Sequence, residues 1–239
     1  MTSEPQLRAQ PPLITPIAGP PGQHPHFAAT APTPRSRKGS PVTPHTPLRV
    51  VNETDGVDLE AAEEAARRFL HALGIRTDTE STQGTPGRMA RAYAELFTPR
   101  AFDLTTFPND EGYDELVLAR SIPFRSVCEH HLLPFVGTAH VGYLPGQRIL
   151  GLSKLARVVE HFACRPQVQE RLTKQIGDWL QLHLDPKGVG VVIEAEHTCM
   201  TLRGVQATGS TTVTSALLGL LRRDQRSRSE FLALTRIAS

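Results

Sequence analysis

Two short runs of metal-binding side chains lie far apart in this sequence of 239 residues. The first run is Cys128-Glu129-His130-His131, and the second, about seventy residues later, is His197-Thr198-Cys199. Thiolate and imidazole are ligands that zinc prefers, so one ion can use both runs only in a fold that brings them together. Two thiols and one imidazole supply three donors, and a four-coordinate ion would keep one position for water, which is typical of catalytic sites.

The same side chains permit other arrangements. A disulfide between Cys128 and Cys199 is one alternative, but the only other cysteine is Cys164, and so sparse and odd a set favours a reducing compartment. A purely structural zinc site is another alternative, with His130 or His197 as a fourth protein ligand. His197 and Cys199 are two residues apart, which places both side chains on one face of an extended strand.

The N-terminal segment differs in composition from the rest of the chain. Residues 1–50 hold 12 of the 20 prolines. They also hold five of the 26 basic residues but only one of the 24 acidic residues, so the rest of the chain carries 21 basic and 23 acidic residues. A segment with so few large apolar side chains cannot bury enough surface to offset its chain entropy. We predict a disordered, basic, proline-rich tail over 1–52 and one catalytic domain over 53–239, and we expect no nucleic-acid partner.

Residue spacing predicts an α+β fold, with helices before and between antiparallel strands. Apolar residues at helical spacing indicate a helix from Leu59 to Leu73, with Asp58 as N-cap and Gly74 as its end. Three further helices are expected, over 86–97, 153–163 and 166–184. Thr85 is the expected cap of the first of these. Strands are expected over 116–127, 138–143 and 188–196, whereas 210–218 fits either a strand or a helix.

Targeting signals are not evident in the sequence. No stretch approaches the roughly 20 apolar residues that a membrane helix needs, and the N-terminus lacks the pattern of a secretory signal. We therefore expect a cytoplasmic protein with no membrane partner.

A candidate anion site begins at Gly151. Ser153, Lys154 and Arg157 place a hydroxyl and two cations in the first turns of an expected helix, where backbone amides also attract phosphate. The alternative is an ordinary N-cap at Ser153 with two solvated cations.

Several longer motifs together resemble the zinc-dependent GTP cyclohydrolase I family. The motifs cover residues 85–90, 126–135, 151–154, 165–173 and 196–205, and they occur in the same order as in the family. The resemblance as a whole runs over residues 57–234. The resemblance implies a tunnelling fold, in which an antiparallel sheet with helices packed on one face joins the sheets of other subunits into a barrel. It also implies a toroidal homo-oligomer, a decamer, with active sites between subunits.

The resemblance also implies a role for each matched residue. Cys128, His131 and Cys199 would bind Zn2+, and His130 and His197 would transfer protons. Glu170 would hold the guanine edge of GTP, with Gln169 beside it in the substrate site. The triphosphate would contact Arg88, Lys154, Arg157 and Arg203, and Ser153 would act at the ribose.

The implied reaction converts GTP and water to 7,8-dihydroneopterin triphosphate and formate, the first step of tetrahydrofolate and pterin biosynthesis. Histidine suits the proton transfers because its unperturbed pKa is about 6.5. A carboxylate at Glu170 can accept two hydrogen bonds from guanine, a donor pair that adenine does not present. Pterin synthases and nitrile reductases share the tunnelling fold, but the Cys, His, Cys ligand set argues against those chemistries.

Overall fold

The computed structural model describes residues 48–50 and 56–236. Most of the predicted tail lies outside these residues, but Leu48–Val50 within it forms strand β1, antiparallel to β2 (Phe102–Leu104). No helix of the described part of the chain is long and apolar enough to cross a membrane.

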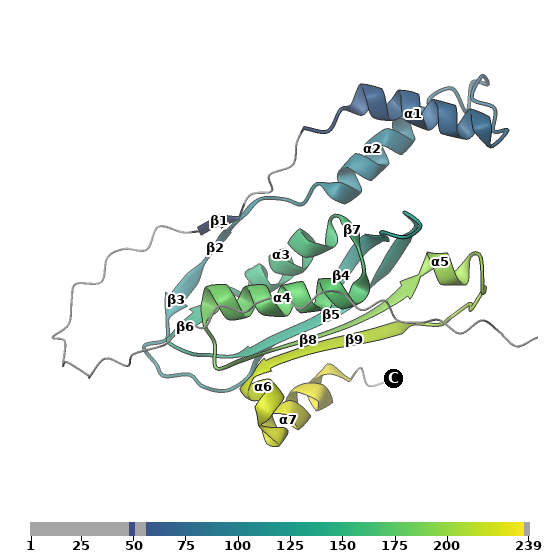
Figure 1. The fold of residues 1–239 in the computed structure, drawn as a ribbon. Coiled ribbons are helices and arrows are strands. Elements are labelled where there is room, and N and C mark those ends of the chain that lie inside the picture. Colours follow the sequence, from purple (N-terminus) through teal and green to yellow (C-terminus); the bar gives the residue numbers. More distant parts are fainter. Residues whose placement is uncertain (1–47, 51–55, 237–239) are drawn as a thin grey trace, which may run out of the picture. The chain divides into compact units, whose positions relative to one another are not determined.

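The centre of the fold is a sheet of five strands in the order β7-β4-β5-β8-β9 (Figure 1). Its strands are β4 (Val117–Cys128), β5 (Pro134–Leu144), β7 (Pro166–Gln167), β8 (Gly188–His197) and β9 (Thr212–Gly219). β4, β5, β8 and β9 are successively antiparallel, whereas β7 is parallel to β4. A separate pair joins β3 (Thr106–Pro108) to β6 (Arg148–Leu150). The α+β prediction is confirmed, and residues 212–219 are a strand.

Seven helices accompany these strands in the described residues, and the N-terminal two pack on one another. They are α1 (Leu59–Ala72), α2 (Thr85–Phe97), α3 (Leu152–Ala163), α4 (Gln169–Leu184), α5 (Thr198–Thr201), α6 (Leu220–Arg223) and α7 (Gln225–Thr235). Asp58 caps α1 as predicted, because its side chain accepts a hydrogen bond from the Ala61 amide at 2.9 Å. The prediction of Thr85 as a cap is wrong, since Gly84 occupies that position. The alternative of Ser153 as an ordinary N-cap is also wrong, since Gly151 is the N-cap of α3.

The start of the helix predicted over 166–184 is also wrong. Pro166 and Gln167 extend beside Val127 and Cys128 as β7, and the helix begins at Gln169. Proline lacks the amide hydrogen that a central ladder needs, so this two-residue strand at the sheet margin is a position it tolerates. The strand holds the metal-binding end of β4 against the start of α4.

Helices cover both faces of the sheet, not only one. α3 and α4 lie over one face, where the main core includes Val127, Phe135, Leu155 and Ile176, all with no exposed surface (Figure 1). Complete burial of one such side chain contributes roughly 1.5–3 kcal/mol. The opposite face packs on α6 and α7, through a smaller cluster formed by Leu144, Leu221 and Phe231.

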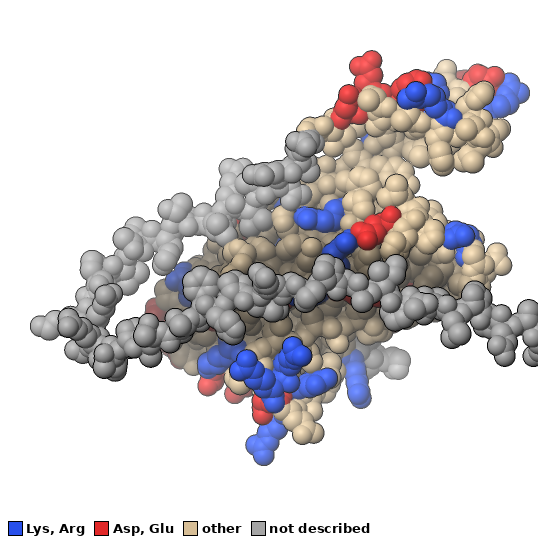
Figure 2. All heavy atoms as spheres, in the orientation of Figure 1, with Lys and Arg blue, Asp and Glu red and all other residues tan. Residues whose placement is uncertain are grey.

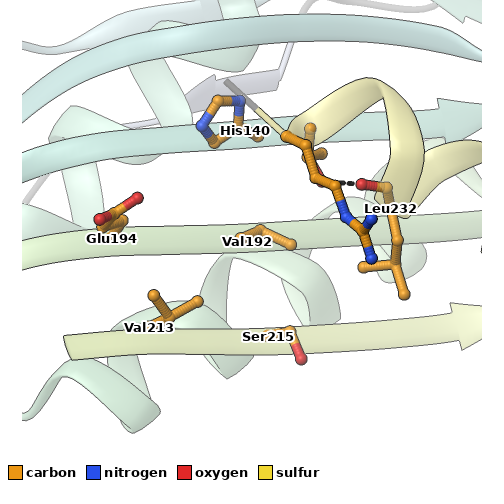
Figure 3. Close-up of a pocket in the computed structure, with 8 residues that line it drawn as sticks. His140, Val192, Glu194, Val213, Ser215 and Leu232 are labelled. Atoms are coloured by element: carbon orange, nitrogen blue, oxygen red, sulfur yellow. Dashed lines mark hydrogen bonds between the residues drawn. The ribbon is translucent and has the colours of Figure 1, made fainter. Parts of the chain in front are cut away.

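The face that carries α7 also has a cavity of about 310 Å3 around a buried histidine. His140 from β5 and Glu194 from β8 lie on it, beside Leu232 of α7 (Figure 3). The His140 Nδ1 atom accepts a hydrogen bond of 3.4 Å from the amide of Ser121, whose φ of 52° marks the bulge in β4. Burial lowers the pKa of His140, nearby Arg120 lowers it further, and Glu194 opposes them.

We predict that His140 makes the protein less stable as the pH falls below about 6.5, the ordinary histidine pKa. The unfolded chain then binds a proton that the folded chain, with its lowered pKa, does not, so the free energy of unfolding decreases. Arg236 also lines this cavity and adds positive charge that opposes protonation. Urea unfolding at pH 5.5 and 7.5 measures the effect. His140→Gln should reduce the loss of stability between these pH values, and an unchanged loss would contradict the prediction.

Candidate functional site

The two metal-binding runs meet at one end of the sheet. β5 and β8 pair so that Phe135 lies opposite His197, and α5 then carries Cys199 back toward the end of β4. Cys128 is the last residue of β4, and a turn follows it in which the Cys128 carbonyl accepts hydrogen bonds from the His131 and Leu132 amides. Leu132 has a φ of 51°, which lets the chain reverse toward β5.

Cys128, His131 and Cys199 form a group suited to a metal ion, because their ligand atoms all lie within 4.8 Å of one another. Cys128 Sγ is 3.8 Å from His131 Nδ1. Tetrahedral zinc with bonds of about 2.0–2.3 Å separates its ligand atoms by roughly 3.5–3.8 Å, so the three donors need only small movements to bind it. Both cysteines are free thiols here, and the alternative disulfide does not form. The donor set and its spacing therefore fit zinc.

The Cys199 thiol is influenced by its neighbours. Burial raises the pKa of Cys199 first, and the adjacent Cys128 raises it further, whereas Arg203 lowers it. Zinc binds thiolates, so a bound zinc ion would favour the deprotonated form of Cys199, which burial and the neighbouring Cys128 disfavour. Arg203 thus lies near the metal ligands, although it does not line the pocket described next.

A pocket of about 230 Å3 surrounds these ligands. Seven residues that the sequence analysis assigned to the site line it, namely Cys128, His130, His131, Gln169, Glu170, His197 and Cys199. Gln167, Val168, Met200 and Thr212 complete the lining. Glu170 is exposed in the first turn of α4, so its carboxylate is accessible from the pocket.

His197 is held rigidly in this pocket. Its ring stacks on Phe135, with the centroids 4.4 Å apart and the planes 7° from parallel. Its Nε2 atom lies 2.7 Å from Gln169 Oε1. The Gln169 amide nitrogen donates to the carbonyls of Ile193 and Thr212, so its oxygen faces the histidine and accepts from Nε2–H. Burial lowers the pKa of His197, and Glu170 partly opposes this.

Gln169 therefore positions His197, a role that the sequence analysis did not assign. The residue is 2% exposed, and both ends of its amide are engaged within the protein. Gln167 lines the pocket as well, although it was not among the site residues predicted from the sequence. It is buried, donates to the Phe162 carbonyl and accepts from Arg171, which in turn pairs with Glu129. The family motif drew attention to Gln169, but no local pattern indicates that either glutamine is buried, because their burial depends on β7 and β8.

The other five predicted site residues do not line this pocket. Ser153, Lys154 and Arg157 are on α3, Arg88 is on α2, and Arg203 follows α5. The Arg157 guanidinium donates to Glu160 at 3.1 Å, and Arg100 binds the same carboxylate at 2.6 Å. The Arg88 guanidinium donates to the Ser81 carbonyl and to the Thr85 hydroxyl. The single chain thus gathers the metal ligands, both histidines and Glu170, but not the cations.

We predict that Cys199→Ser weakens zinc binding by at least about 100-fold, because a neutral hydroxyl replaces a thiolate ligand. Competition with a chromogenic chelator measures the affinity. Cys164→Ser is the matched control, since Cys164 is buried at the end of α3 and is not part of the metal-binding group. Equal zinc affinity in the two variants would contradict the assignment.

Comparison with known proteins gives a consistent result. The family model for GTP cyclohydrolase I matches residues 62–236. A protein of Aquifex aeolicus named GTP cyclohydrolase 1 is 52% identical over 180 residues, which cover 75% of this chain and 98% of that protein. Proteins of the same name from Mycobacteroides abscessus and Caldanaerobacter subterraneus are 54% and 51% identical, over 74% of this chain and 89% and 97% of theirs. The chain therefore belongs to the GTP cyclohydrolase I family.

Proposed function

We propose that the pocket around Cys128, His131 and Cys199 is where this GTP cyclohydrolase I opens the imidazole ring of GTP. The chain is a hydrolase of this type, and its products are formate and 7,8-dihydroneopterin triphosphate. The observation that carries the site assignment is that one pocket contains three metal donors, two further histidines and an accessible carboxylate. A ring-opening hydrolysis needs all three kinds of group.

Cys128, His131 and Cys199 would hold zinc in this pocket. When bound, zinc supplies Lewis acidity that makes water reactive toward carbon 8 of guanine at neutral pH. His130 and His197 would transfer protons during ring opening and formate release, since both line the same pocket. Gln169 accepts from Nε2–H of His197, so the second ring nitrogen, Nδ1, is the one left to exchange a proton.

Glu170 would select guanine over adenine. Its carboxylate accepts two parallel hydrogen bonds from the ring N–H and exocyclic amine of guanine, whereas adenine lacks this pair of donors. Its place in the first turn of α4, on the pocket with His197, supports this role.

The triphosphate contacts would come from more than one copy of the chain. Arg88, Lys154, Arg157 and Arg203 remain the proposed clamp, with Ser153 at the ribose, although none of them lines the pocket of the single chain. A homo-oligomer with active sites between its subunits would bring these cations to the pocket. The assembly that we propose is a toroidal decamer, in which the sheets of neighbouring subunits join into barrels. A triphosphate carries three to four negative charges, which requires several cations from different segments. We also propose a cytoplasmic location.

The test of this function is turnover of GTP by the purified, zinc-loaded protein. We expect formate release together with a product that becomes a fluorescent pterin on oxidation. His197→Ala should lower kcat by about 100-fold or more, because general acid and base catalysis contributes 10^2 to 10^4 in rate. The control is His71→Ala, at an exposed position on α1. An unchanged rate in the His197 variant would count strongly against the mechanism.

We predict that Glu170→Gln lowers kcat/KM for GTP by about 10- to 100-fold. The amide keeps the size of the side chain but loses one acceptor and the charge, and a hydrogen bond to a charged group contributes about 1.5–3 kcal/mol. Steady-state kinetics of formate release measure the effect, and Glu60→Gln, on the exposed first turn of α1, is the matched control. If both variants keep the wild-type kcat/KM, Glu170 does not bind guanine.

One observation favours a second candidate, a purely structural zinc site. Cys128 Sγ lies 4.0 Å from His130 Nδ1, so His130 is within reach of becoming a fourth ligand. The Nε2 atom of His197 is already engaged by Gln169 and its ring stacks on Phe135, which leaves only Nδ1 as a possible ligand atom. A structural site would unfold on chelation and would not turn over GTP, whereas the catalytic site should lose activity while the far-ultraviolet circular dichroism is kept.

A further inference from the structure

The metal-binding turn offers two neighbouring histidines, and one of them joins the metal-binding group. Cys128 Sγ lies 3.8 Å from His131 Nδ1 and 4.0 Å from His130 Nδ1. His131 completes the group with Cys199, whereas His130 is not part of it. Because both imidazoles lie almost equally close to Cys128, the position of the turn itself decides which of them can bind the metal.

Glu129, the residue between Cys128 and His130, is anchored through both its side chain and its backbone. Its carboxylate accepts hydrogen bonds from both terminal nitrogens of the Arg171 guanidinium, so the pair is bidentate. Its amide donates to the Gln167 carbonyl at 3.0 Å. A bidentate pair fixes orientation as well as distance. Residue 129 is therefore tied to α4 and to β7 at the same time.

This anchor is itself held from the interior of the protein. Arg171 Nε donates to Gln167 Oε1 at 3.0 Å. Gln167 is buried, and its amide nitrogen donates to the Phe162 carbonyl at 2.9 Å and to Gln175 Oε1 at 2.8 Å. Both polar atoms of the Gln167 side chain thus have partners, and they orient the guanidinium that binds Glu129.

The Glu129–Arg171 pair differs from most ion pairs of the described residues. Most of those join charges on one helix, as the mixed charges along α1 illustrate (Figure 2). Such exposed pairs contribute little, because they must order two long side chains. The Glu129–Arg171 pair instead connects the metal-binding turn to α4, across 42 residues of sequence. Since Gln167 already orders Arg171, less side-chain entropy is lost when the pair forms.

Backbone hydrogen bonds extend this restraint to His130. The Cys128 carbonyl accepts a hydrogen bond from the His131 amide at 3.3 Å, which closes the turn. The His130 ring lies edge-on to the His131 ring, with the two planes 88° apart. The backbone on both sides of His130 is thus held, which limits how closely its ring can approach Cys199.

We propose that the Glu129–Arg171 pair, supported by Gln167, positions the turn so that His130 stays outside the coordination sphere of zinc. The proposal rests on the catalytic function proposed above, and it adds what keeps the site from closing into one with four protein ligands. Neither Glu129 nor Arg171 lines the pocket, so both act through His130. Keeping that imidazole unbound leaves one zinc position for water and leaves His130 free to transfer protons.

Zinc affinity tests the positioning role, because a fourth protein ligand strengthens binding. Arg171→Ala releases Glu129, and we expect the zinc dissociation constant to fall at least about tenfold as His130 replaces water. Glu129→Gln keeps the size of the side chain and removes its charge, and it should act in the same direction. Lys174→Ala is the control, because it removes an exposed ion pair with Asp178 from the same helix and should leave the affinity unchanged. Competition with a chromogenic chelator measures the affinity.

A second substitution identifies the ligand responsible. His130→Ala added to Arg171→Ala should return the zinc affinity to within about threefold of the wild type, whereas His130→Ala alone should change it by less than about threefold. The visible absorption of the protein loaded with Co2+ in place of zinc reports the ligands directly. Arg171→Ala should change these bands, and the added His130→Ala should remove that change.

The sign of the change in affinity separates positioning from simple support. If Arg171 only supported the metal ligands, its loss would weaken zinc binding by about 10- to 100-fold. An Arg171→Ala protein that is folded by circular dichroism and binds zinc no more tightly than the wild type would overturn the proposal. A gain in affinity that persists after His130→Ala would overturn it as well. None of these measurements uses GTP, so formate release by the wild type tests the proposed function separately.

Discussion

The antiparallel pairing of β5 with β8 is the interaction on which the site depends. Ten residue pairs, from Phe135 with His197 to Leu144 with Gly188, fix the two strands in one register. Because side chains alternate between faces, a shift of one residue would turn His197 away from Phe135 and exchange the two faces of β8. The α3 and α4 helices cover the face with Val191 and Ile193, and Phe231 packs against Gly190 on the other. The core thus specifies the register that brings Cys199 to Cys128.

The site combines a rigid interior with an open rim. Gln169 and Phe135 are buried and hold His197 from two directions, whereas His131 and Glu170 are exposed. Rigid support suits the proton-transfer role proposed for His197, since a misplacement of about 1 Å can cost 10^2 in rate. Exposed groups at the rim suit the entry of a substrate. The cations proposed for the triphosphate lie on other elements, and the proposed assembly would bring them to the site.

The candidate metal ligands and the histidines proposed for proton transfer could be picked out from the sequence because their residue types are unusual at that spacing. Thiols and imidazoles in two runs point to zinc whatever the intervening fold, and family motifs give them roles. Helix boundaries were less predictable. The start of α4 moved from Pro166 to Gln169 because pairing with β4 competes with helix formation at those residues, and that pairing is a tertiary contact.

The sequence by itself determined the chemistry available to this protein and the α+β order of its elements, because periodicity and ligand type are local properties. The tertiary structure decided which of those groups meet. It set Gln169 against His197 and placed α7 on the face opposite α4. These features depend on strand order and register, which arise from contacts between residues far apart in the chain.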